Sequence, residues 1–154
     1  MFKEGVRAFL SCFYLGYIPF APGTFGSILG FLFCVFIHMS WMFLFVLSIV
    51  SVFFISFYNE ELDPSWIVID EFLGIMLCLL LIQAFCPYWN AFSLILGFLF
   101  FRLFDIWKPV PIRPIDQYLL SHKKTHALAV VLDDLLAGIM AFGFTYLVLP
   151  PMIH

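Results

Sequence analysis

The feature that most constrains this chain is the length of its uncharged apolar runs. Residues 25–58 contain no Asp, Glu, Lys or Arg, and this run is longer than the roughly 20 residues that one transmembrane helix needs. The whole chain is 64% hydrophobic and 11% charged, whereas soluble domains are about 25% charged. We therefore expect an all-α, polytopic membrane protein, and not a soluble, disordered or disulfide-stapled one.

Breaks in the apolar pattern divide the chain into five predicted membrane-embedded helices. The tripeptide 38–40 splits the first run, and Asp63 followed by Pro64 is a start signal for a later helix. The proline-rich segment 109–114 ends the fourth helix. A polar connector, 110–125, contains a short amphipathic piece, and an interfacial helix precedes all the spans. The predicted spans are 25–38, 41–58, 66–85, 89–107 and 126–149.

The basic residues predict how the helices are oriented. Lys3 and Arg7 precede the first span, and a second group follows the fourth. With five spans both groups face one side, which the positive-inside rule assigns to the cytoplasm. A single long helix over 25–58 would instead place them on opposite sides. The second group comprises Arg102, Lys108, Arg113, Lys123 and Lys124.

Acidic residues occur inside the last three predicted spans, near their cytoplasmic ends. They are Asp70 and Glu71, Asp105, and Asp133 and Asp134. A charge at the centre of a span costs about 2.5–3.5 kcal/mol, and less near the ends. Such a set therefore needs a neutralising partner. Mg²⁺ is one candidate, because it takes oxygen ligands and shares its coordination with substrate phosphates.

The two acidic pairs have similar surroundings, IVIDEFLGI over 67–75 and VVLDDLLAGI over 130–139. Gly74 and Gly138 each follow an acidic residue by four positions, so each lies on the same helix face as a carboxylate. Small residues let membrane helices approach closely. We expect these two helices to pack together and to bring their acidic groups into one place.

Simpler explanations exist for some of the charged residues. The macrodipole of its own helix could stabilise Asp70. Arg102 and Asp105, three positions apart, could form a plain intrahelical ion pair. His126 precedes Asp133 by seven residues and shares a similar face, and the sequence leaves open whether it reaches the site.

Four short motifs follow one another along most of the chain, from about residue 16 to 145. They are PGTFGS (22–27), DPSWIVIDEFLG (63–74), FRLFDIWKPVPIR (101–113) and LDDLLAG (132–138). In combination they resemble the phosphatidylglycerophosphatase A family, bacterial membrane enzymes that remove the phosphate from phosphatidylglycerophosphate. The resemblance implies an all-helical fold, Mg²⁺ dependence and an anionic phosphomonoester lipid as substrate. The chain departs from the family at 126–130, where members usually have a glycine-containing stretch.

The resemblance and the mechanism it implies assign roles to ten residues. Four carboxylates are predicted to hold the Mg²⁺: Asp70, Glu71, Asp133 and Asp134. Three residues are predicted to be catalytic: Arg102, Asp105 and Lys108. Three more are predicted to bind the substrate phosphate: Gly23, Thr24 and Arg113.

The individual roles follow from the chemistry of phosphate-ester hydrolysis. Asp105 would be a further ligand or the base that orients water, and the cationic side chains would pair with phosphate oxygens. The turn Gly23-Thr24 would offer backbone N–H groups to the same anion, with Thr24 as the cap of the following helix. Direct attack by water and an aspartyl-phosphate intermediate are both compatible with the sequence.

Three other functions are compatible with parts of the pattern. A cation-coupled carrier would need acidic residues past the membrane midplane, and a CDP-alcohol phosphotransferase would need a D-x2-D-G start, which is absent. A scaffold subunit would leave the buried acids unexplained.

The expected setting is therefore one multi-pass domain, 1–154, in the bacterial inner membrane, with its active site facing the cytoplasm. Its partner is the lipid substrate, a homo-oligomer is compatible with the sequence, and the net charge of −3 argues against nucleic acid.

Overall fold

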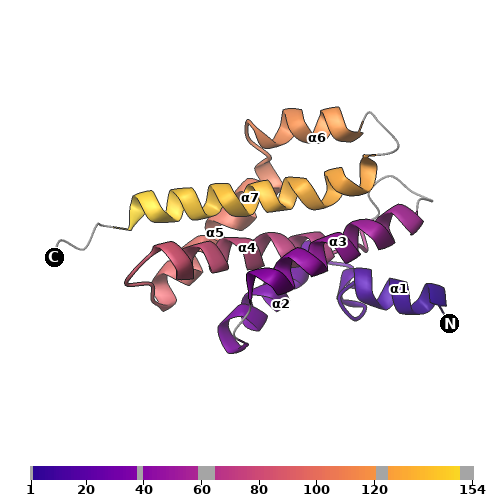
Figure 1. The fold of residues 1–154 in the computed structure, drawn as a ribbon, viewed down its shortest axis with the longest axis horizontal. Helices are drawn as coiled ribbons and strands as arrows, with labels where there is room; N and C mark the ends of the chain where they lie inside the picture. Colours follow the sequence, from indigo (N-terminus) through magenta and orange to yellow (C-terminus); the bar gives the residue numbers. More distant parts are fainter. Residues whose placement is uncertain (1, 38–39, 59–64, 121–124, 150–154) are drawn as a thin grey trace.

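The computed structural model describes residues 2–37, 40–58, 65–120 and 125–149. In these ranges the chain forms seven α-helices and one 3₁₀ turn, η1, at Leu15–Tyr17, with no strand (Figure 1). The all-α expectation is confirmed. The helices are α1 (Phe2–Leu10), α2 (Pro22–Phe36), α3 (Trp41–Tyr58), α4 (Ile69–Phe85), α5 (Ala91–Trp107), α6 (Ile112–Leu120) and α7 (His126–Val148).

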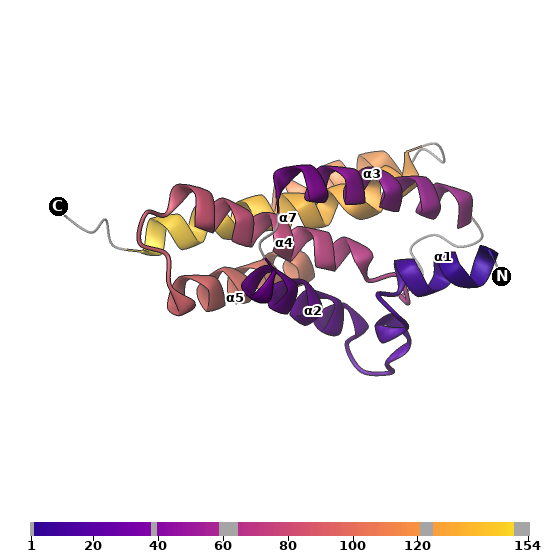
Figure 2. The ribbon, with the colours of Figure 1, turned by 60° about the horizontal axis from the view of Figure 1, so that its bottom comes forward.

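The bundle is built around α4 and α7, which contact each other along the long axis of the molecule. Helix α4 also contacts α2, α3 and α5, and α7 also contacts α3, α5 and α6. Figures 1 and 2 show α6 on the outer side of α7, away from α2, and α1 at the end of the bundle where α7 begins. The C-terminal end of α7 lies at the opposite end.

The close contact between α4 and α7 depends on two glycines. A Cβ atom added at Gly74 would lie 2.6 Å from the backbone oxygen of Asp134, and one at Gly138 would overlap the carbonyl oxygen of Gly74. Real Cβ atoms do not approach other atoms so closely. The prediction that these small residues bring the two acidic helices together is therefore confirmed.

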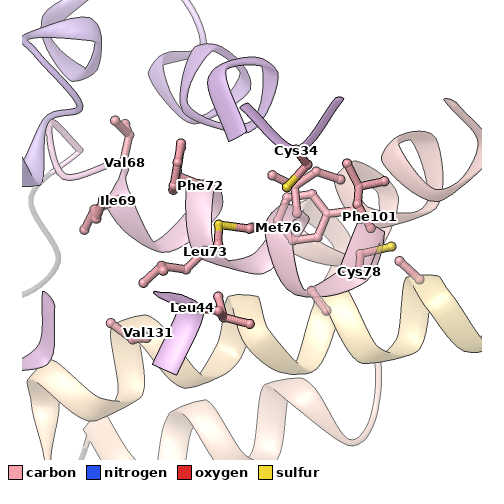
Figure 3. Packing of buried hydrophobic residues seen from close by; sticks show 14 of the residues in the cluster. Cys34, Leu44, Val68, Ile69, Phe72, Leu73, Met76, Cys78, Phe101 and Val131 are labelled. Atoms are coloured by element: carbon pink, nitrogen blue, oxygen red, sulfur yellow. The ribbon is translucent and has the colours of Figure 1, made fainter. Parts of the chain in front are cut away.

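Large apolar side chains of α4 fill the centre of the bundle. Leu73 and Met76 of α4 and Phe101 of α5 are fully buried in the same core cluster (Figure 3). Eleven of the 17 residues of helix α4 are buried. A helix that is apolar all round belongs in the interior of a bundle, so α4 acts as the central support for the residues at its first turn.

Most predicted helix boundaries agree with the structure. Helix α2 ends at Phe36 and α3 begins at Trp41, which confirms the division of the first apolar run, and α7 matches the fifth prediction within one residue. Helix α5 begins at Ala91, two residues later than predicted, because Asn90 caps it. The Asn90 side chain accepts a hydrogen bond from the N–H of Ser93 (3.1 Å), a standard N-cap arrangement.

Two predicted helix starts were wrong. Helix α4 begins at Ile69 and not at Trp66, because the N–H of Val68 donates to the carbonyl of Leu10 (3.0 Å) at the end of α1. The predicted start signal for this helix, Asp63-Pro64, lies outside the described residues.

Helix α2 begins at Pro22, so Thr24 is not its cap. The N-cap is Ala21, which has left-handed backbone angles and makes no side-chain capping bond. Proline suits the first turn of a helix because its missing N–H would have no helical partner there.

The structure supports the membrane prediction only in part. Of the described helices, α7, with 23 residues, is the one that is long and apolar enough to cross a membrane, and α2 and 41–57 of α3 are shorter apolar helices. The expectation of five membrane-embedded helices and an interfacial α1 stays a prediction.

Candidate active site

A cavity of about 300 Å³ lies where the first turns of α2 and α4 meet α5, α6 and the first half of α7. Its lining is strongly acidic, because six carboxylates and one lysine side chain face it. The lysine is Lys108, at the end of α5. The carboxylates are Asp70 and Glu71 of α4, Asp105 of α5, Asp116 of α6, and Asp133 and Asp134 of α7.

Three of these carboxylates form a cluster that could hold a metal ion. Oxygen atoms of Asp70, Glu71 and Asp134 all lie within 4.8 Å of one another. Among the described residues, the buried Oε2 atom of Glu71 has no hydrogen-bond partner. A buried carboxylate oxygen without a donor is costly unless a cation faces it. We call Asp70, Glu71 and Asp134 the acidic trio.

The local structure of α4 and α2 favours this cluster. Asp70 and Glu71 occupy the first turn of α4, where the helix macrodipole stabilises negative charge. The macrodipole interpretation of Asp70 is therefore compatible with its place in the trio. Gly23 of α2 lines the cavity beside them, and a Cβ at this position would overlap the carboxylate of Glu71. Glycine at residue 23 thus leaves the space that the Glu71 side chain occupies.

Lys108 forms a second cluster with two carboxylates. Its ammonium group donates a hydrogen bond to Oδ2 of Asp133 and lies 3.4 Å from Oδ2 of Asp116. Burial lowers the pKa of Lys108, but the hydrogen bond and charge of Asp133 outweigh this effect, so the pKa lies above its ordinary value. Lys108 is therefore a cation at neutral pH. We call Lys108, Asp116 and Asp133 the lysine centre.

The backbone of Lys108 is in an unusual conformation. It ends α5 with φ 45° and ψ 62°, in the left-handed region, which costs a non-glycine residue about 1–3 kcal/mol. Its N–H still donates to the carbonyl of Phe104 (2.8 Å), and Pro109 follows. The left-handed turn stops the helix at this residue and fixes the point from which the lysine side chain leaves the chain.

Arg102 and Asp105 form an ion pair within α5, as the simpler sequence interpretation allowed. Arg102 also donates to the hydroxyl of Ser27 (3.1 Å) and to the hydroxyl of Thr24 (3.2 Å), both on α2. Asp105 lines the cavity, whereas Arg102 does not. Arg102 thus connects α5 to α2 and pairs with Asp105 from outside the cavity lining.

Three other predicted or suspected residues lie outside the cavity lining. Thr24 uses its hydroxyl for Arg102, and its N–H donates to the carbonyl of Ala21 (2.9 Å). Arg113 is exposed on α6. His126 is buried at the start of α7, and its Nε2 atom has no hydrogen-bond partner among the described residues.

Asp116 was not among the residues predicted for the site. The sequence predicted a polar connector at 110–125 with a short amphipathic piece, in which Asp116 stands four residues after Ile112 and four before Leu120. In a helix these three residues share one face, and in the structure Ile112 is buried and Leu120 lines the cavity. An acidic residue on the apolar face of the predicted amphipathic piece was the signal that could have identified it.

Comparison with known proteins gives a family and several relatives. The model of the family Phosphatidylglycerophosphatase A matches residues 8–149. A Phosphatidylglycerophosphatase A of Escherichia coli K12 is 33% identical over 86 residues, which cover 56% of this chain and 45% of the relative.

Two relatives match over more of their length. The Phosphatidylglycerophosphatase A of Haemophilus influenzae is 31% identical over 135 residues, 82% of this chain and 77% of the relative. A protein of Bacteroides thetaiotaomicron named "Putative phosphatidylinositol-3-phosphatase" is 29% identical over 140 residues, 82% of each chain. No solved structure matches the chain.

Proposed function

Because this chain belongs to the phosphatidylglycerophosphatase A family, we propose that it hydrolyses phosphatidylglycerophosphate to phosphatidylglycerol and inorganic phosphate. Its family and relatives make it a phosphoric monoester hydrolase. The observation that carries the proposal is the cavity, where carboxylates and a lysine from four helices face one space. A cation-coupled carrier fits less well, because the acidic residues of the described helices α4, α5 and α7 gather in this one cavity and do not continue along those helices.

The charge of the cavity supports a divalent cation as the cofactor. Six carboxylates face one lysine, so a phosphate dianion would meet strong repulsion in the bare protein. We propose that the acidic trio holds Mg²⁺, a fit that the unpartnered Oε2 atom of Glu71 supports. Bound there, the ion would lower the pKa of a water molecule and neutralise charge on the phosphate oxygens.

Asp133 receives a different role from the one that its sequence suggested. Oδ2 of Asp133 accepts from Lys108, and Oδ1 accepts from the N–H of Asp134 (3.0 Å). Both oxygens are therefore in use within the protein. We assign Asp133 to holding the lysine, and Asp134 to the metal.

The remaining residues act on the phosphate and the water. Lys108 would bind a phosphate oxygen through its ammonium group. Asp105, held by Arg102, would accept the proton of the attacking water, and Arg102 would act through Asp105. Gly23 would provide space beside Glu71, and the exposed Arg113 would attract anionic lipid headgroups.

The proposed setting is the bacterial inner membrane, crossed several times, with the cavity on the cytoplasmic side. Large apolar side chains are exposed along the helices, among them Phe45 and Phe53 of α3 and Leu103 of α5, which is unfavourable in water and natural in lipid. The basic α1 lies at the same end of the bundle as the start of α7 (Figure 2). By the positive-inside rule, we infer that this end faces the cytoplasm.

The experiment is phosphate release by purified protein in detergent, with phosphatidylglycerophosphate and with phosphatidylinositol 3-phosphate, each with Mg²⁺ and with a chelator. We expect Mg²⁺-dependent release from phosphatidylglycerophosphate, lost in Asp70→Asn and kept in Glu4→Gln, which removes an exposed carboxylate of α1. Release from the inositol lipid alone would overturn the proposed substrate. Equal rates for wild type and Asp70→Asn would overturn the proposed site.

A further inference from the structure

Asp116 brings a carboxylate into the cavity from a helix outside the central bundle. Helix α6 packs on α7, and the Asp116 side chain is 13% exposed and points toward Lys108, with 3.4 Å between Oδ2 and Nζ. Asp133 of α7 approaches the same ammonium group. Lys108 therefore has one carboxylate partner on α6 and another on α7.

We propose that Asp116 is a positioning residue that, with Asp133, holds the Lys108 ammonium ready for a phosphate oxygen. This inference rests on the proposed function, because it takes the phosphate ester as the ligand of Lys108. An ammonium group has three N–H donors and no acceptor. Two carboxylates use two of these donors, and the third stays available to a ligand in the cavity.

The two partners restrict the lysine more than either would alone. A lysine side chain is long and flexible, and ordering it costs conformational entropy. The left-handed backbone at residue 108 fixes where the side chain begins, and Asp116 and Asp133 fix where it ends. Without Asp116, the ammonium group keeps its contact with Asp133 but can rotate and become hydrated. A smaller fraction of the enzyme molecules then holds the ammonium group in the position that binds the phosphate.

The contact between Asp116 and Lys108 connects α6 to the residue that we propose to bind the phosphate. Leu120, one turn after Asp116, also lines the cavity, so α6 covers the site beside the lysine centre. Arg113 and Gln117 of this helix are exposed. Asp116 is thus the charged residue through which α6 affects the cavity, and Gln117 on the same helix offers a neutral control.

The test is the kinetic effect of Asp116→Asn on phosphate release from phosphatidylglycerophosphate. We expect KM to rise about tenfold, the effect of losing one charge-assisted hydrogen bond, with kcat within about threefold of wild type. Asp116→Glu, which keeps the carboxylate, is expected to retain KM within about threefold, and Gln117→Ala to match wild type. An Asp116→Asn enzyme with unchanged KM, or an Asp116→Glu enzyme as impaired as Asp116→Asn, overturns the inference.

A double-mutant cycle separates positioning from a general structural effect. If Asp116 acts through Lys108, Asp116→Asn in a Lys108→Met background changes kcat/KM by less than about twofold, because the interaction is already lost. If Asp116 only stabilises α6, the two losses multiply and the inference fails.

A measurement without any lipid keeps the inference distinct from the proposed function. An amine-reactive label with mass spectrometry reports how tightly Lys108 is held, with the exposed Lys3 as the internal reference. We expect labelling of Lys108 to rise several-fold in Asp116→Asn and to stay unchanged in Gln117→Ala. Unchanged labelling in Asp116→Asn refutes the positioning role. Increased labelling in a protein that releases no phosphate from phosphatidylglycerophosphate refutes the proposed function and leaves the contact established.

Discussion

The acidic trio and the lysine centre share one cavity but differ in how their charges are balanced. The trio, Asp70, Glu71 and Asp134, consists of carboxylates alone, and within the described ranges the Oε2 atom of Glu71 has no hydrogen-bond partner. The lysine centre contains its own cation, Lys108. We therefore propose a cation from solution for the first arrangement, whereas the second already pairs its carboxylates with a cation.

Asp133 and Asp134 show how neighbouring residues come to differ. They are adjacent in the sequence, but successive residues of an α-helix point about 100° apart because a turn takes 3.6 residues. Asp134 therefore faces the first turn of α4, and Asp133 faces Lys108 at the end of α5. A pair of acids in one motif can thus serve two functions, and the division between them can be tested.

The largest predicted effect concerns the trio. Glu71→Gln keeps the shape of the side chain but removes its charge, and we expect kcat/KM for phosphate release to fall about a thousandfold, since several kcal/mol of transition-state stabilisation depend on the metal. Glu4→Gln should have no effect, because Glu4 is exposed on α1. A loss of less than about tenfold in Glu71→Gln would show that this carboxylate is not a ligand.

The next largest effect concerns the lysine centre. Lys108→Met removes the ammonium group and keeps a long apolar chain, and we expect kcat/KM to fall about a hundredfold, the value of a buried charged hydrogen bond to phosphate. Metal affinity should not weaken, because the trio is intact. A lower affinity for Mg²⁺ in this variant would contradict the separation of the two clusters.

A moderate effect is expected where α4 and α7 touch. Gly138→Ala would force its Cβ against the carbonyl of Gly74, so we expect the free energy of unfolding in detergent to drop by about 1–3 kcal/mol. Gly143→Ala is the matched control on the same helix, since a Cβ there meets nothing within 4 Å. This control should be neutral or more stable by about 0.5–1 kcal/mol. Equal stability of the two variants would disprove the close approach that builds the trio.

The smallest effect is expected outside both clusters. Arg113 is exposed and absent from the cavity lining, so Arg113→Ala should change kcat by less than about twofold, as expected for a surface substitution. Relative to wild type, Arg113→Ala should have a higher KM for lipid in vesicles, and this difference should grow as the fraction of anionic lipid rises. A large drop in kcat would place Arg113 inside the site after all.

The sequence predicted what depends on local pattern. Apolar runs and glycine spacing were enough to place α7, the break between α2 and α3, and the convergence of acids from α4, α5 and α7. The late start of α4 was not predictable, because it depends on a hydrogen bond between Val68 and the distant Leu10. The separate partners of Asp133 and Asp134 were also missed, since they depend on how α4, α5 and α7 pack around these two side chains. Asp116 was missed because the amphipathic piece within 110–125 was predicted without assigning any of its residues to the site.

The most direct test of this account is Mn²⁺ binding, followed by electron paramagnetic resonance, in wild type, Glu71→Gln and Asp133→Asn. Mn²⁺ takes the same oxygen ligands as Mg²⁺. The account predicts a site in the wild type that is lost in Glu71→Gln and retained in Asp133→Asn. No Mn²⁺ site in the wild type, or equal loss in both variants, would contradict a metal held by the acidic trio apart from the lysine centre.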